Sequence, residues 1–185
     1  MNVRAYEEKD KAAIERICRD TVTDETLKKN LDAVTLLYAD FYVETEPQNV
    51  FVAVNDDDEC VGYVLCAHSA ETFEENWKNG YLKKVRAKSF ALYLAQKFSI
   101  KNYRKLAKKG YEAHLHIDLD ESVQRQGLGT KLIDALARHL KKDGVSGVCL
   151  DCSAKNVKGN SFYKKYGFTL LKSSPFGNVY GLKLN

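Results

Sequence analysis

The segment from His114 to Leu140 constrains the fold more than any other part of this chain. Residues 112–119 form a strand-like run, a short glycine-containing turn follows, and apolar residues then recur at helical spacing up to Leu140. A helix N-terminus leaves backbone N–H groups unpaired and carries the positive end of the helix dipole. Gly127 and Gly129 remove side chains that would keep a ligand away from those groups. The segment therefore predicts a cradle for phosphate.

The spacing of the glycines excludes two common phosphate-binding motifs. Leu132 occupies the place of the third glycine of the dinucleotide fingerprint, and no Gly-Lys-Ser/Thr follows as in a P-loop. The run Gln-Arg-Gln-Gly-Leu-Gly at 124–129 instead resembles the pyrophosphate-binding segment of the GNAT superfamily of N-acetyltransferases.

Composition predicts one globular domain over residues 1–185. The chain has 44% hydrophobic residues, only two prolines and no Gly/Ser-rich linker. Its net charge of +4 does not by itself indicate nucleic acid, so we rank that partner last. We expect a cytoplasmic protein without a membrane partner, because the sequence shows neither a membrane-spanning run nor a signal peptide.

The cysteines are predicted to be reduced core thiols. Five is an odd number, and most of them lie in apolar, strand-like segments. Cys149 and Cys152 have the Cys-x-x-Cys spacing of redox and zinc motifs, but no second pair accompanies them. An offset of three residues on a strand points the two thiols to opposite faces, which favours structural roles.

The remaining periodicities predict a mixed α/β fold. Strands are expected at 2–6, 112–119 and 145–151, and β-hairpins at 50–68 and 168–184, the latter turning at 175–178. Helices are expected at 9–20, from Asp24 to Phe41, at 71–87, 89–107 and 156–167.

The segment from Lys78 to Lys109 is unusual in its charge. It holds eleven Lys or Arg residues, no Asp or Glu, and several aromatic residues. Two amphipathic helices with a solvated basic face would explain this pattern. Alternatively, the segment covers a binding cleft and meets a cofactor phosphate, an acidic substrate or, last, nucleic acid.

Three polar residues alternate on the strand before the cradle. His114, His116 and Asp118 share one face of that strand. They could hold a metal, perform acid/base or orienting work in a cleft, or pack with satisfied hydrogen bonds. We predict no metal site and leave the other two alternatives open.

A second motif strengthens the resemblance to the GNAT superfamily. That family carries an Asn, a small residue three positions later, then Leu/Phe-Tyr and Gly-Phe. The chain has Asn156, Gly159, Phe162-Tyr163 and Gly167-Phe168 in the same order. The helical insertion at 70–110 departs from an ordinary member. Together with the run Ala-His-Leu-His-Ile-Asp at 113–118, it looks like the acetyltransferase-like domain of O-GlcNAcase proteins and its stand-alone bacterial relatives.

The resemblance implies a mixed, mostly antiparallel sheet that is splayed at a central strand and flanked by helices. Acetyl-CoA would lie in the opening. Leu119 would bond the pantetheine arm through its backbone, Asn156 would contact that arm, and Tyr163 would protonate the departing thiolate. The backbone N–H groups that would hold the pyrophosphate belong to Gln124, Arg125, Gln126, Gly127, Leu128, Gly129 and Thr130.

The implied activity is acetyl transfer from acetyl-CoA to a primary amine, either a small molecule or a peptide amine. Amine attack on a thioester needs a base, a stabilised oxyanion and a proton for sulfur, but no covalent enzyme intermediate. Asp118 is the preferred general base and His116 the other candidate. The alternative is a catalytically weak or inactive module that binds a CoA ester or a protein partner. A homodimer is left open.

Overall fold

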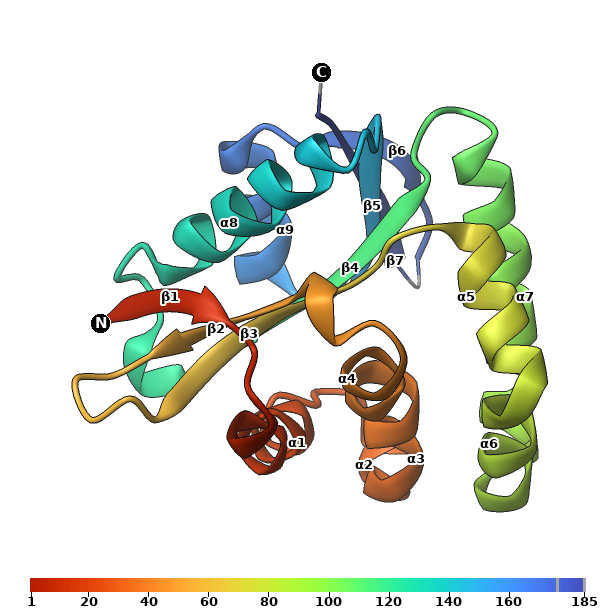
Figure 1. The fold of residues 1–185 in the computed structure, drawn as a ribbon. Helices are drawn as coiled ribbons and strands as arrows, with labels where there is room; N and C mark the ends of the chain where they lie inside the picture. The colour runs from red at the N-terminus through yellow and green to blue at the C-terminus, as the bar shows by residue number, and fades with distance from the viewer. Residues whose placement is uncertain (176, 185) are drawn as a thin grey trace.

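The computed structural model describes residues 1–175 and 177–184, and its centre is a seven-stranded sheet (Figure 1). Every neighbouring pair in the sheet is antiparallel except β4 and β5, which are parallel. This confirms the expected mixed, mostly antiparallel sheet. In spatial order the strands are β1 (Asn2–Ala5), β2 (Val50–Val54), β3 (Cys60–Ala67), β4 (Ala113–Leu119), β5 (Gly147–Ser153), β7 (Gly177–Lys183) and β6 (Thr169–Ser173).

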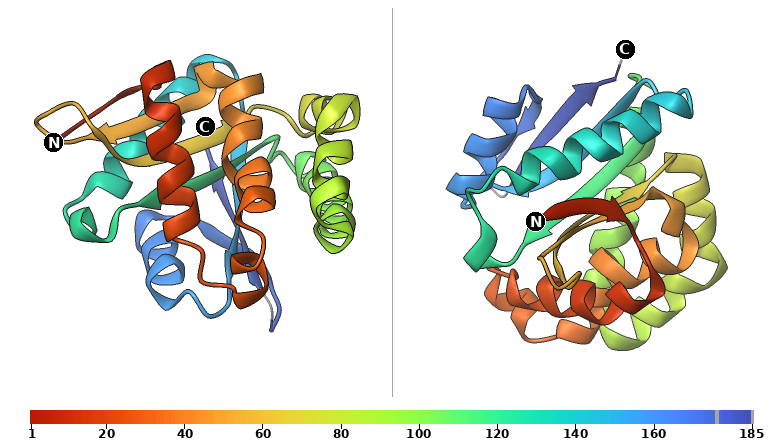
Figure 2. Two further views of the ribbon diagram at one scale, coloured as in Figure 1. Left: turned by 90° about the horizontal axis from the view of Figure 1, so that it is seen from below. Right: turned by 60° about the vertical axis from the view of Figure 1, so that its left-hand side comes forward.

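Helices cover both faces of the sheet (Figures 1 and 2). One face packs against α8 (Leu128–Lys142) and α9 (Val157–Tyr166). The other face packs against α1 (Lys11–Asp20), α3 (Leu31–Thr35), α4 (Phe41–Thr45), α5 (Ala70–Asn76), α6 (Leu82–Lys88) and α7 (Phe90–Ala107).

Strand alternation divides the core between these two faces. On β3, Tyr63 and Leu65 belong to the cluster with α1 and α4, whereas Val64 and Cys66 belong to the cluster with α8. Cys149 and Cys152 also fall into different clusters, as their spacing predicted. All five cysteines are free and buried, in agreement with structural roles.

The helical insertion is present where it was expected. α5 and α6 form one continuous helix through a π-helical turn at Trp77–Tyr81, and α7 returns antiparallel to it. The predicted helix from Asp24 to Phe41 was wrong in one respect, because it breaks after the short α2 (Glu25–Lys28). Asn30 lies outside helical geometry there, and its side chain caps α3 by accepting from the Ala33 N–H.

The C-terminal hairpin is also present, although its strands differ from prediction by a few residues at each end. The expected turn at 175–178 includes Phe176, which lies outside the described residues.

The parallel pair β4–β5 is joined at one end only. Its register contains Ala113 opposite Val148 and His114 opposite Cys149, while β4 stays paired with β3 as far as Leu119. The two strands therefore part after His114, which confirms the predicted splay.

The joined end is held together by contacts that involve the chain before β4. Glu112 accepts hydrogen bonds from the N–H groups of Ser146 (3.1 Å) and Gly147 (3.2 Å). A Cβ on Gly147 would lie 2.4 Å from the Gly110 carbonyl oxygen, so only glycine permits this approach of the two backbones. These contacts fix which end of the sheet stays closed and which end opens.

Candidate active site

The turn that leads into α8 presents a run of unpaired backbone N–H groups. Within the described part of the chain, the amides of residues 125–130 donate to no backbone or side-chain acceptor, and the first amide of the region that does is that of Lys131, to the Gly127 carbonyl. Arg125 and Gly127 have positive φ angles of 64° and 79°, which turn the backbone just before the helix. Six successive free amides at a helix N-terminus are the arrangement on which the phosphate prediction depends. The Gln124 amide, also expected to hold the pyrophosphate, instead donates to the Glu121 carbonyl at 3.3 Å.

This cradle lies at the open end of the sheet (Figure 1). A short 3₁₀ turn at Glu121–Val123 follows β4 directly and leads into it. The loop is anchored at its start by Asp120. The Asp120 N–H donates to the Val61 carbonyl (2.9 Å), and the Asp120 carboxylate accepts hydrogen bonds from the two terminal nitrogens of the Arg16 guanidinium (2.9 Å each).

The last residue of β4 directs its main chain into the gap. In an antiparallel ladder alternate residues bond to the same neighbour. Because Asp120 bonds to β3, the N–H and C=O of Leu119 point away from β3, towards the side on which β5 has parted. The Leu119 carbonyl already accepts from Gln124 Nε2 at 3.3 Å, but its second lone pair is available to a ligand.

The two glycines of the cradle serve different purposes. Gly127 needs its left-handed conformation, and a Cβ there would meet nothing within 4 Å, so the space above it is open. Gly129 is buried, and its Cβ would lie 3.2 Å from the Phe162 ring of α9. The missing side chain of Gly129 therefore allows α8 to approach α9, a packing role that was not anticipated, while its role towards a ligand stays a prediction.

Asp118 is held at the edge of the gap by a buried tyrosine. The Tyr63 hydroxyl donates to its carboxylate at 2.8 Å. Burial raises the pKa of Asp118 from 3.8 to about 6, and the hydrogen bond from Tyr63 opposes part of that rise. At neutral pH the group is ionised, yet it is a far better proton acceptor than an ordinary aspartate. Tyr63 was not anticipated, because only the register of β3 on β4 brings it to Asp118.

The three alternating polar residues of β4 lie in different environments. His114 is 1% exposed, stacks on Tyr103 at 3.9 Å between ring centroids and bonds to the Tyr42 hydroxyl at 2.9 Å. Burial lowers its pKa well below the usual value, so it is a neutral core residue. His114 therefore fits the packing alternative in part, because Nε2 is bonded but the buried Nδ1 has no hydrogen-bond partner among the described residues.

His116 lies between His114 and Asp118 on β4 and contacts two tyrosine rings. The rings of Tyr38 and Tyr42 meet it edge-on, each at 5.2 Å between centroids. Burial lowers the pKa of His116 to about 4. An imidazole with so low a pKa is a weaker base than Asp118, which agrees with the preference for Asp118. Within the described residues, no group of three or more His, Cys, Asp or Glu side chains is arranged to hold a metal ion.

The Tyr163 side chain is buried in the core on the side of the sheet that packs against α8 and α9. Its ring contacts Phe162, Phe168 and Tyr180 at 5.4 to 5.6 Å between centroids. No hydrogen bond to its hydroxyl is found within the described chain, and that oxygen is not among the fully enclosed, unpaired polar atoms. Burial, with the charges of Cys152 and Asp118, raises the pKa of Tyr163. Tyr163 is therefore protonated, free to donate, and within electrostatic reach of Asp118.

Asn156 has a structural role that the motif did not reveal. Its Oδ1 accepts from the Gly159 N–H at 2.8 Å and so caps α9. A Cβ on Gly159 would lie 2.7 Å from Asn156 Nδ2, which explains the small residue three positions later. The side-chain nitrogen of Asn156 is the part that is left for a ligand.

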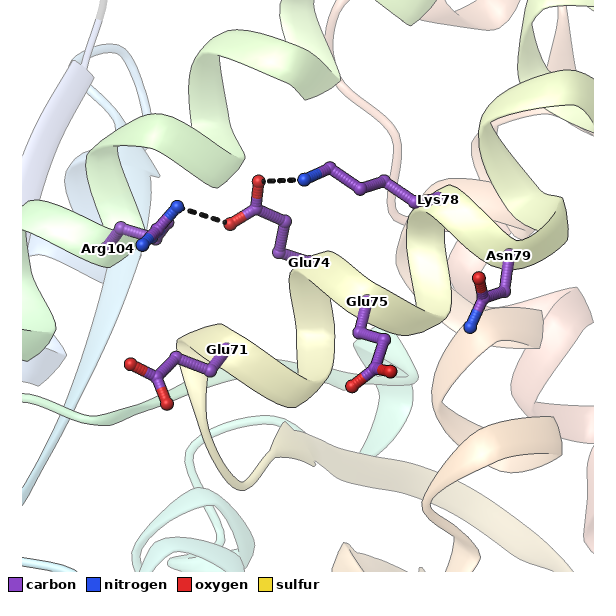
Figure 3. A pocket seen from close by; sticks show the side chains of 6 residues that line it. All are labelled: Glu71, Glu74, Glu75, Lys78, Asn79 and Arg104. Carbon is purple, nitrogen blue, oxygen red and sulfur yellow. Dashed lines mark ion pairs between the residues drawn. The ribbon is translucent and has the colours of Figure 1, made fainter.

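The basic insertion is far from the cradle. α5, α6 and α7 stand beside the start of β4, whereas the cradle follows its end (Figures 1 and 2). The insertion therefore does not supply cations to a phosphate in the cradle. A surface pocket of about 260 Å³ on the insertion is lined by three acidic side chains of α5, Glu71, Glu74 and Glu75, together with Lys78, Asn79 and Arg104 (Figure 3). Glu74 forms ion pairs there with Lys78 and Arg104, at 2.6 and 2.9 Å.

Comparison with known proteins agrees with the geometry. The GNAT acetyltransferase family model matches residues 13–168. The crystal structure of SsHAT superposes with a TM-score of 0.87 at 24% identity and covers 100% of this chain and 98% of its own. The PaiA N-acetyltransferase from Thermoplasma acidophilum, solved with coenzyme A, gives 0.64 at 14% identity over 98% of each chain.

A third similar structure is that of an enzyme named for a protein substrate. The ribosomal-protein-S18-alanine N-acetyltransferase from Escherichia coli has a TM-score of 0.55 at 15% identity and covers 100% of this chain and 94% of its own. At such identities these structures establish the fold, and the family match extends over most of the sequence. The chain belongs to the GNAT acetyltransferase family.

Proposed function

We propose that this protein transfers the acetyl group of acetyl-CoA to a primary amine within a ternary complex. The observation that carries the proposal is the cradle of six free amides beside the gap between β4 and β5. A diphosphate in the cradle would satisfy those amides, and an extended arm could then follow the parted edge of β4 to Leu119. Bound acetyl-CoA would supply the activated thioester.

Two side chains and one backbone edge would perform the chemistry. Asp118, ionised at neutral pH, would accept the proton of the attacking amine, directly or through a water. The Leu119 edge would orient the acetyl carbonyl, where one well-aimed N–H donor contributes roughly 3 kcal/mol. Tyr163 would give its proton to the departing sulfur. His116 is the second candidate base, although its low pKa makes it the weaker one.

The alternative function, a module that binds a CoA ester without turnover, has support in two contacts. The Leu119 carbonyl is bonded to Gln124, and the Asn156 oxygen caps α9. Each of these groups therefore has less hydrogen-bonding capacity left for a ligand than the family motif implies. Retention of the thioester in the presence of amines, aminosugars, polyamines and peptides would favour this alternative.

The test uses a matched pair of glycines. Gly127 and Gly144 have φ angles of 79° and 77°, and an added Cβ meets nothing within 4 Å at either site. Gly127→Ala and Gly144→Ala should therefore lose similar stability, about 1 kcal/mol each. Only Gly144, at the far end of α8, lies outside the cradle.

We expect acetyl-CoA and CoA to raise the melting temperature of the native protein and of Gly144→Ala, and to raise that of Gly127→Ala much less. CoA release would then be screened across the amines named above. No stabilisation by millimolar acetyl-CoA would exclude the proposed function, and equal stabilisation of both variants would exclude the cradle as the binding site.

A further inference from the structure

Helix α7 has apolar side chains on two opposite sides. Its inner side packs Ile100 and Tyr103 against the core. On the outer side Phe90, Leu94 and Phe98 are 59%, 50% and 62% exposed. These three recur every four residues and so form one row on the helix surface, which we call the outer row. No packing requirement of this fold explains three large apolar groups in solvent.

The same side of α7 carries cations that have no carboxylate partner, although Lys97 lies over the Tyr93 ring. Lys97, Lys101 and Lys105 are exposed and follow each other at four-residue spacing, with Lys97 three residues after Leu94 and Lys101 three residues after Phe98. No ion pair joins these lysines to any carboxylate in the described part of the chain.

Two carboxylates near the insertion pair with other cations, whereas Glu71 and Glu75 on α5 form no ion pair in the described part of the chain. Glu74 pairs with Lys78 and Arg104, as Figure 3 shows, and Asp32 pairs with Lys88. The outer side of α7 is therefore apolar and positive, with no acidic residue anywhere from 78 to 109.

A second copy of the chain is a poor occupant for this face. Antiparallel pairing about Leu94 would bring each Phe90 against the other Phe98. It would also carry Lys101 and Lys105 past the start of the other α7, beside Arg86 and Lys88, where like charges repel. The outer row is also much smaller than the roughly 800 Å² that each partner buries in a stable interface.

Single-stranded nucleic acid also fits poorly. Binding of that kind relies on successive aromatic side chains on which bases stack. Phe90 and Phe98 are two helical turns apart, about 12 Å along the axis, and the residue between them is Leu94.

We propose that the outer side of α7 adsorbs to an anionic lipid surface. The outer row enters the headgroup region, and Lys97, Lys101 and Lys105 lay their alkyl stems along it and pair with lipid phosphates and carboxylates. α7 stands at the edge of the molecule (Figures 1 and 2), and a planar lipid surface accepts such a convex helix without a matching groove. Adsorption needs no spanning segment, and no described helix is long and apolar enough to be one. The expectation that the protein has no membrane partner was based on the absence of a spanning segment.

Vesicle co-sedimentation tests this proposal without reference to acetyl transfer. Vesicles of phosphatidylcholine alone are compared with vesicles that also contain phosphatidylserine, at low and at physiological salt. We expect binding to the anionic vesicles only, weakened by salt. Two triple variants should each bind roughly a hundredfold more weakly: Phe90→Ala with Leu94→Ala and Phe98→Ala, and Lys97→Gln with Lys101→Gln and Lys105→Gln.

The matched control removes three exposed lysines elsewhere, by Lys141→Gln, Lys142→Gln and Lys164→Gln, and should keep binding within a few fold. All changed side chains are exposed, so unchanged melting temperatures verify folding. No binding to anionic vesicles at low salt overturns the proposal. So does binding that the control weakens as much as the α7 variants, or a dimer that the apolar variant dissociates.

Discussion

Replacing Asp118 with Asn should stabilise the protein at neutral pH while it abolishes acetyl transfer. Burial raises the pKa of Asp118 from 3.8 to about 6, so the folded protein binds this proton more tightly than the unfolded chain does. The protein is therefore most stable with Asp118 protonated, and it loses that stability as pH rises from about 4 to above 6. Asn has nearly the same shape, carries no charge and still accepts from the Tyr63 hydroxyl.

The magnitude follows from the shift. A difference of about two pKa units corresponds to about 3 kcal/mol, and the partial exposure of Asp118 reduces this to about 2 kcal/mol. We compare the free energy of unfolding of Asp118→Asn with that of the native protein. The difference between the two should be about 2 kcal/mol larger at pH 8 than at pH 4.

Urea denaturation of both proteins at several pH values from 4 to 8 measures this difference. The comparison between pH values removes any constant effect of the substitution itself. Asp120→Asn is a matched control, since that carboxylate lies two residues further along and pairs with Arg16 on the surface. A difference between Asp118→Asn and the native protein that is independent of pH would refute the reasoning, because the carboxylate would then not be held in a desolvated, ionised state.

Two further substitutions test the proton donor and the closed end of the sheet. Tyr163→Phe should lower kcat by about tenfold or more, because the proton donor to sulfur is lost. The Kd for CoA, measured by calorimetry, should not change, because the Tyr163 hydroxyl has no hydrogen-bond partner in the described protein to lose. A raised Kd with normal kcat would contradict the role of proton donor. Glu112→Ala should lower the free energy of unfolding by about 1 to 3 kcal/mol in urea denaturation, because the amides of Ser146 and Gly147 lose their acceptor. Glu112→Gln, which keeps an acceptor oxygen, should recover most of that loss, and equal losses in both variants would contradict the explanation.

Local patterns in the sequence were sufficient to predict the elements of the site. The strand predicted at 112–119 and the helix predicted up to Leu140 are found at Ala113–Leu119 and Leu128–Lys142. They follow from side-chain period and turn chemistry, which depend on neighbouring residues only. The helical hairpin at 70–107 and the opposite faces of Cys149 and Cys152 follow in the same way. Where such a pattern was interrupted by a local cap, as at Asn30, the prediction was less accurate.

Tertiary structure decided what each residue does. Alternation placed His114, His116 and Asp118 on one face of β4. Because β5 leaves β4 after His114, His114 is a core residue and Asp118 lies at the edge of the gap. The pKa of Asp118 depends on burial and on Tyr63, which is 55 residues away in the chain. Gly129 serves the contact of two helices for the same reason. Period and capping act between near neighbours, whereas desolvation and packing depend on which distant segments the fold brings together.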